Sequence, residues 1–157
     1  MTATKTQAIP KGFHSITPHM IVKGAAAYID FLKRAFGAVE DGRMPGPGGR
    51  IMHAQVQIGD SKLMFGDHFP EFGGPAYAEG RFPVVLHLYV PDADKTFAQA
   101  LAAGCTATMP LADQFWGDRY GHVVDPFGFT WAIATHKEDL TPEEMQKRQA
   151  AAFAKPC

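Results

Sequence analysis

Four histidines form two pairs, His19 with His87 and His53 with His122, whose members are separated by nearly the same interval along the chain. An imidazole titrates near neutral pH and can transfer protons, and its neutral form can also bind zinc, nickel or iron. The repeated positions therefore indicate catalysis or ligand binding, with packed, hydrogen-bonded histidines as the structural alternative.

The residues around these histidines repeat with the same spacing. The segments HMIV (19–22) and HLYV (87–90) are apolar strand patterns, and each precedes an apolar helical stripe that ends before a glycine. Two further pairs of landmarks keep nearly the same interval, namely Gly37 with Gly104 and Gly59 with Gly128. Each half of the chain therefore predicts a β-α-β-β-β unit.

The repeat predicts an α+β fold in which tandem βαβββ units form a curved, half-open mixed β-sheet barrel with the helices outside. We expect a single domain over residues 1–157. Its parts are a first half at 11–67, a connector at 68–81, a second half at 82–137, and a C-terminal helix and tail at 138–157. The last helix should begin after Thr141, because TPEE combines a capping box with proline at the first helical position.

Strand alternation divides the side chains of each predicted strand between two faces. In residues 52–58 the apolar face, expected to pack on a helix, consists of Met52, Ala54, Val56 and Ile58. The opposite, concave face collects polar side chains, namely His53, Gln55 and Gln57, with Thr17, His19, His87, Tyr89 and His122 by the same parity. A concave surface with a few converging polar groups is the usual small-molecule site. We assign His19 and His87 as candidate catalytic bases, and Thr17, His53, Gln55, Tyr89 and His122 as ligand contacts.

The segment FWGDRYG (115–121) supplies a further candidate. Phe115 and Trp116 could stack on a planar ligand while Arg119 pairs with its carboxylate or phosphate, so Arg119 joins the candidate ligand contacts. The structural alternative is that Trp116 covers one end of the core and that Arg119 bridges to Asp118 or to a partner subunit.

Composition restricts the classes of partner. The net charge is −1, which argues against nucleic-acid binding and a membrane surface, because both need a basic excess. No apolar run reaches the roughly 20 residues of a membrane helix, and the N-terminus lacks the apolar stretch of a signal peptide. The two cysteines, Cys105 and Cys157, predict no disulfide framework and fit a reducing compartment. We therefore expect a cytoplasmic protein.

A tandem β-α-β-β-β chain with a DPFG turn at 125–128 resembles the vicinal oxygen chelate superfamily, which includes glyoxalase I, bleomycin-resistance proteins and extradiol dioxygenases. The resemblance covers about Phe13 to His136. The segments HAQVQIGDSKLMFGD (53–67) and MPLADQFWGDRYGHVVDPFGFTWAIATHKEDLTPEE (109–144) further resemble its PhnB-like, glyoxalase-like branch.

The resemblance implies a metal site with one ligand from the first and the last strand of each half. The corresponding positions in this chain are Thr17, Met64, Val85 and Ala132. None of them is an imidazole or a carboxylate, so we expect no cofactor and no metal ligand at these positions. A displaced zinc, nickel or iron site on the concave-face histidines is the alternative.

The sequence thus predicts a homodimeric, glyoxalase/bleomycin-resistance-like protein that binds a small molecule in the concave cavity without the usual metal. The alternative is a lyase, isomerase or dioxygenase that uses a displaced metal, or His19 or His87 as a general base. A third hypothesis, an interaction role, rests on the C-terminal helix, whose thin apolar stripe fits the surface or a partner subunit.

Overall fold

A computed structural model describes residues 6–74, 77 and 79–154, which form two compact units divided between residues 78 and 79. Cys157 and three positions of the predicted connector (75, 76 and 78) lie outside the described residues. The two units are described one at a time.

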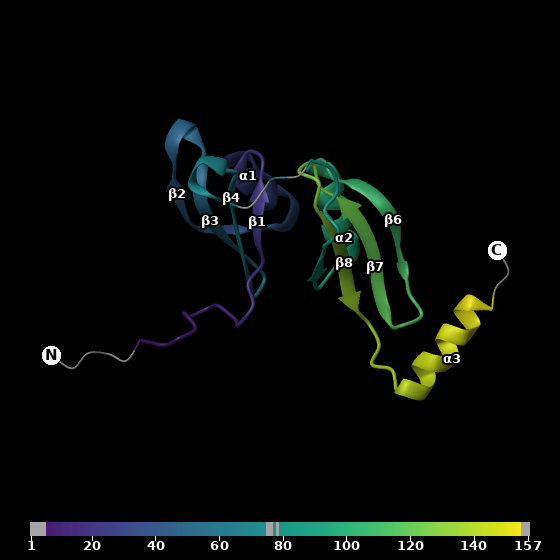
Figure 1. The fold of residues 1–157 in the computed structure, drawn as a ribbon. Coiled ribbons are helices and arrows are strands. Elements are labelled where there is room, and N and C mark those ends of the chain that lie inside the picture. Colours follow the sequence, from purple (N-terminus) through teal and green to yellow (C-terminus); the bar gives the residue numbers. More distant parts are fainter. Residues whose placement is uncertain (1–5, 75–76, 78, 155–157) are drawn as a thin grey trace. The chain divides into compact units, whose positions relative to one another are not determined.

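The first unit is an open four-stranded sheet with one α-helix. Its elements are β1 (His19–Val22), α1 (Ala25–Phe36), β2 (Val39–Pro45), the short 3-10 helix η1 (Pro47–Gly49), β3 (Ile51–Ile58), β4 (Ser61–Asp67) and η2 (Pro70–Phe72). The strand order is β1-β4-β3-β2, with β1 parallel to β4 and the other pairs antiparallel (Figure 1).

The second unit repeats this arrangement. Its elements are β5 (Val85–Tyr89), α2 (Ala93–Ala102), β6 (Thr106–Asp113), β7 (Asp118–Val124), β8 (Thr130–His136) and the C-terminal helix α3 (Pro142–Phe153). The strand order β5-β8-β7-β6 matches that of the first sheet, again with one parallel pair, β5 with β8. The predicted α+β class and the tandem β-α-β-β-β repeat are confirmed.

In the first unit, α1 forms the core with one face of the sheet. Tyr28, Ile29 and Leu32 recur at helical spacing and are fully buried, as are Val56 and Phe65 on the strands. The rings of Tyr28 and Phe65 lie 5.0 Å apart, edge to face. The helix ends at Gly37, whose φ of 65° is the left-handed conformation that closes helices and that the sequence predicted.

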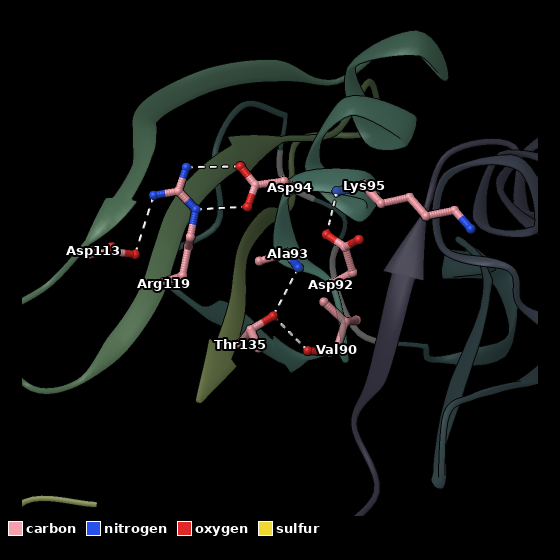
Figure 2. A network of polar contacts seen from close by, with 8 residues as sticks. All are labelled: Val90, Asp92, Ala93, Asp94, Lys95, Asp113, Arg119 and Thr135. Carbon is pink, nitrogen blue, oxygen red and sulfur yellow. Dashed lines mark hydrogen bonds and ion pairs between the residues drawn. The ribbon is translucent and has the colours of Figure 1, made fainter. Parts of the chain in front are cut away.

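A polar side chain near the end of the last strand anchors the start of each helix. In the first unit Asp67 accepts hydrogen bonds from the backbone N–H groups of Gly24 (2.8 Å) and Ala25 (3.0 Å), and of Ile51 on β3 (2.7 Å). In the second unit Thr135 Oγ1 accepts from Ala93 N (2.8 Å) and donates to Val90 O at 2.7 Å (Figure 2). These contacts satisfy helix N–H groups that have no partner within the helix.

The capping box and the DPFG turn predicted from the sequence are present, and an aspartate also caps α2. Asp92 caps α2 by accepting from Lys95 N at 3.0 Å (Figure 2), and Thr141 and Glu144 form the capping box of α3. In the DPFG turn the buried Asp125 accepts from the backbone of Phe129 (3.0 Å) and from Trp131 Nε1 (2.9 Å). This aspartate therefore fixes the turn between β7 and β8.

The predicted helix-facing position of Met52 is wrong, because the side chain is 39% exposed whereas Ala54 and Val56 are fully buried. The register between β2 and β3 shifts here: Met44 pairs with His53 but Pro45 pairs with Ile51, so Met52 is an extra residue in the strand. A bulge of this kind breaks the alternation from which the prediction was made.

Helix α3 contributes no buried residue, and Phe153 near its end is 74% exposed. The ring of Phe153 lies against that of Phe115, at 5.9 Å between ring centroids. Among the residues that the structure describes, no helix is long and apolar enough to cross a membrane.

We expect Asp67→Ala to lower the free energy of unfolding by about 3 kcal/mol, because it leaves backbone N–H groups at the start of α1 and on β3 without their charged acceptor. Urea denaturation followed by circular dichroism measures this. Asp60→Ala is the matched control, since that carboxylate accepts from the neighbouring Ser61 hydroxyl in an exposed turn; its cost should stay below about 0.5 kcal/mol. Equal effects of the two variants would contradict the anchoring role of Asp67.

Candidate functional site

Four rings share the face of the second sheet that lies opposite α2. The register places His87 of β5 and His122 of β7 on either side of Ala132 in β8, and Tyr89 and Tyr120 on either side of Ala134. We call His87, Tyr89, Tyr120 and His122 the aromatic cluster. Its ring centroids are 4.5 Å apart for His87 and Tyr89, 5.5 Å for His87 and Tyr120, and 5.0 Å for Tyr120 and His122.

Tyr120 and His122 form a hydrogen-bonded pair within this cluster. Tyr120 Oη lies 2.5 Å from His122 Nε2. Burial lowers the pKa of His122, and the neighbouring His87 lowers it further, whereas burial raises the pKa of Tyr120. Both shifts favour the neutral forms, so the pair is an uncharged phenol and an uncharged imidazole near neutral pH.

Tyr89 is connected to a chain of charged groups. Its hydroxyl donates to Asp118 Oδ2 at 3.2 Å, and the Asp118 side chain is only 4% exposed. The other oxygen of Asp118 lies 2.7 Å from His136 Nδ1, and His136 Nε2 lies 2.8 Å from Asp139 Oδ1. Burial and the adjacent Asp118 raise the pKa of Tyr89, and hydrogen bonds to Asp139 and Asp118 raise the pKa of His136.

The first unit also brings predicted site residues together. His19 and His53 lie with their rings 5.5 Å apart at 90°, and the pKa of His19 is lowered by burial and then by His53. Gln55 Nε2 donates to Asp41 Oδ2 at 2.8 Å, and Lys62 forms an ion pair with the same carboxylate. Thr17 is half-buried two residues before β1. This face is therefore polar, and the charge of Lys62 on it is already paired.

Cross-strand register corrects the predicted equivalence of His53 and His122. Met64 in β4 pairs with His19 and with Gln55, whereas Ala132 in β8 pairs with His87 and with His122. Gln55 is therefore the structural counterpart of His122. The mismatch arises because the turn at residues 59–60 is shorter than the turn at 125–129, so a constant sequence offset misses the register.

Arg119 lies on the other face of β7, because it alternates with Tyr120. Its guanidinium holds Asp94 of α2 with two hydrogen bonds, of 2.7 Å and 2.8 Å, and contacts Asp113 of β6 at 3.3 Å (Figure 2). The structure thus brings Arg119 to α2 and not to His122. Of the neighbouring aromatic residues, Trp116 packs edge-on against Tyr120 at 5.2 Å, and Phe115 packs on Trp116.

The positions at which the family resemblance implies metal ligands do not fit a metal. Thr17, Met64, Val85 and Ala132 carry neither an imidazole nor a carboxylate. The register sets His19 beside Met64 and His87 beside Ala132, which adds one imidazole and no carboxylate in each unit. Among the residues that the structure describes, no three His, Cys, Asp or Glu side chains come together as a metal site requires. We therefore derive no step through a metal ion.

Sequence reasoning missed Tyr120 and Asp118 as members of the site. Both belong to the same face of β7 as His122, at two and four residues before it, so extending the strand alternation backward would have found them. The hydrogen-bond partners of Asp118, Tyr89 on β5 and His136 on β8, depend on strand order, which the sequence does not specify. The partner of Tyr120 is His122, two residues away on the same strand.

A family model described as the Glyoxalase/Bleomycin resistance protein/Dioxygenase superfamily matches residues 12–133. An uncharacterized protein of Mycobacterium bovis is 43% identical over 136 residues, which cover 84% of this chain and 90% of that protein.

Solved structures show the same fold. TioX from Micromonospora sp. ML1 has a TM-score of 0.62 and 26% identity, covering 82% of this chain and all (100%) of that chain. A PhnB protein from Bacillus cereus has a TM-score of 0.61 at 17% identity, covering 78% of this chain and 99% of that chain, and shows the fold alone. The resemblance predicted from sequence motifs is thereby confirmed.

We expect His122 to titrate below the ordinary imidazole pKa of 6.5, and His87→Gln to move its pKa upward, because the substitution removes a neighbouring positive charge. The titration of the histidine Cε1–H signals by carbon-edited NMR measures both values. His14→Gln, in the segment before β1, serves as the control and should leave the His122 titration unchanged. An unshifted His122 in the His87→Gln variant would contradict the coupling.

The raised pKa of His136 predicts a pH dependence of stability. A raised folded-state pKa contributes stability that is complete below the ordinary value of 6.5 and is lost as the pH rises through the raised value. The difference in urea midpoint between the wild type and His136→Gln should therefore be larger at about pH 6 than at about pH 9. A difference that grows with pH would show that His136 does not bind these carboxylates as an imidazolium.

Proposed function

Because the chain belongs to the glyoxalase/bleomycin resistance protein/dioxygenase superfamily, we propose that it binds a small organic molecule at the aromatic cluster of its second unit. The protein acts in this proposal as a cytoplasmic homodimer and without the metal ion that the family resemblance implies. The ligand is modest in size and partly aromatic or oxygenated.

The observation that carries the proposal is the composition of the central strand beneath the cluster. Ala132 and Ala134 present only methyl groups between rings of the neighbouring strands. Both alanines are fully buried, whereas Tyr89 at the sheet edge is 60% exposed. Aromatic side chains of this kind offer both stacking area and hydrogen-bonding atoms to a planar ligand.

Metal independence is supported by the side chains at the implied ligand positions. Thr17, Met64, Val85 and Ala132 lack the imidazole and carboxylate groups that zinc, nickel and iron prefer. The homodimer is supported by the family resemblance and by α3, which buries none of its residues in the single chain. An unpartnered helix with an exposed phenylalanine fits contact with a second subunit.

A lyase, isomerase or dioxygenase of the glyoxalase type is the second candidate function. The hydrogen bond between Tyr120 and His122 favours it, because it holds a phenol and a neutral imidazole in proton-transfer contact beside the candidate base His87. His87 stands beside this pair, at 5.5 Å from the Tyr120 ring, and would serve as the base in this case.

The proposal is tested by titrating the protein with benzyl alcohol, a small oxygenated aromatic probe, while the histidine Cε1–H signals are recorded. We expect saturable shifts of the His87 and His122 signals, with the His14 signal as an internal control. Tyr120→Phe and His122→Ala should weaken the binding several-fold. Absence of any saturable shift at His87 and His122 would overturn the proposed ligand site.

Elemental analysis of protein purified without chelators tests the metal status separately. We expect zinc, nickel and iron far below one ion per chain, with no saturable uptake on titration. One ion per chain or per dimer, lost in His19→Ala or His87→Ala, would instead establish the metal-dependent enzyme.

A further inference from the structure

Both tyrosines in the aromatic cluster donate their hydroxyl hydrogens to other side chains of the protein. Tyr89 donates its hydrogen to Asp118, whose carboxylate can only accept. Asp118 is in turn held by His136, so its orientation is fixed from the opposite side. Toward a ligand, Tyr89 Oη therefore offers lone pairs and no hydrogen.

Tyr120 likewise donates its hydroxyl hydrogen within the protein. In its contact with His122 Nε2 the phenol is the stronger acid and the imidazole nitrogen the stronger base, so the hydrogen belongs to Tyr120 Oη and points at the ring nitrogen. The lowered pKa of His122 keeps its ring neutral, so one ring nitrogen is free of hydrogen and can accept from Tyr120. Tyr120 Oη, like Tyr89 Oη, is then an acceptor toward a ligand, while His122 Nδ1–H remains as a donor.

Negative charges outnumber positive charges near the aromatic cluster. Asp118 and Asp139 both contact the single imidazole of His136, so the three groups carry a net negative charge whatever the protonation state of that ring. None of the residues on this face of β5, β7 and β8 is lysine or arginine. The neighbouring cations in the sequence, Arg119 and Lys137, both interact with a carboxylate of α2 on the opposite face.

We infer that the aromatic cluster selects planar ligands that carry a hydrogen-bond donor, an ammonium group above all, and discriminates against carboxylates and phosphates. This inference rests on the proposed function and specifies its ligand class. The ammonium group of such a ligand donates hydrogen bonds to the two phenolic oxygens and lies in the negative field of Asp118. The aromatic ring of the same ligand stacks on the cluster. A carboxylate would face two acceptor oxygens and no lysine or arginine, with only imidazole N–H groups of the cluster to donate to it. A hydroxyl group, which is both donor and acceptor, ranks between the two.

Three probes of matched size test the order: benzylamine as the ammonium, benzyl alcohol as the hydroxyl and benzoate as the carboxylate. Each is titrated at the same ionic strength near neutral pH, and the shifts of the His87 and His122 Cε1–H signals give the dissociation constants. We expect the binding to weaken from benzylamine to benzyl alcohol to benzoate, with at least about a tenfold difference between the first and the last.

Two conservative variants locate the origin of this preference. Tyr89→Phe and Tyr120→Phe keep the rings and remove one acceptor oxygen each, so each should reduce the preference for benzylamine over benzoate by about threefold or more. Arg119→Gln is the matched control: it removes a cation from the other face of the same strand and should leave the preference unchanged. Loss of benzoate binding in Arg119→Gln would instead assign carboxylate recognition to Arg119 and overturn the inference. Circular dichroism confirms that each variant is folded.

The outcomes separate this inference from the proposed function. Benzoate binding as tightly as benzylamine, with shifts at both histidines, would overturn donor selectivity and leave the ligand site standing. A preference that persists undiminished in both tyrosine variants would also overturn the inference, because the acceptors would then not create it. Failure of all three probes to shift either histidine would overturn the ligand site itself.

Discussion

Each unit depends on a polar side chain at the end of its last strand that accepts the N–H groups at the start of the helix. Without Asp67 in the first unit and Thr135 in the second, these groups would be desolvated and unpaired, at a cost of about 1–3 kcal/mol each. The anchors hold each helix on one face of its sheet. The parallel pairing of the first and last strands needs a crossover connection, which here includes the helix. Within each unit the helix covers one face of the sheet, and the candidate site residues other than Arg119 lie on the opposite face.

The two free faces have diverged at one structurally equivalent position on the central strand. In the first unit, Met64 lies between His19 and Gln55. In the second unit the corresponding residue is Ala132, which lies between His87 and His122 and is fully buried. Around this methyl group four rings contact one another, which is why the proposed ligand site belongs to the second unit.

The repeat, the fold class and most helix ends were predictable because they depend on local signals, such as Gly37 after α1. The prediction failed at Met52, where a bulge interrupts the alternation, because bulges depend on how two strands pair.

For the candidate site, the sequence predicted which side chains share one face of the sheet but not which of them contact one another. Alternation correctly put His87 and His122 on one side of the second sheet, and applied to Arg119 it would have put that residue on the other side. The expectation that Arg119 contacts a ligand came from its charge alone, and that charge is balanced by carboxylates 25 and 6 residues away in the sequence.

The same dependence on pairing explains why Tyr89 presents an acceptor oxygen, although a tyrosine hydroxyl can also donate. A tyrosine hydroxyl can do either until a neighbour accepts its hydrogen, and for Tyr89 and Tyr120 the neighbours are a buried carboxylate and an imidazole nitrogen. Asp118 on β7 meets Tyr89 on β5 because of the strand order of the sheet, whereas Tyr120 and His122 lie two residues apart on β7 itself. The identity of the side chains sets which bonds are possible, and for Tyr89 the topology decides which way the hydrogen points. Specificity at such a face is therefore a property of the sheet register as much as of the residues that line it.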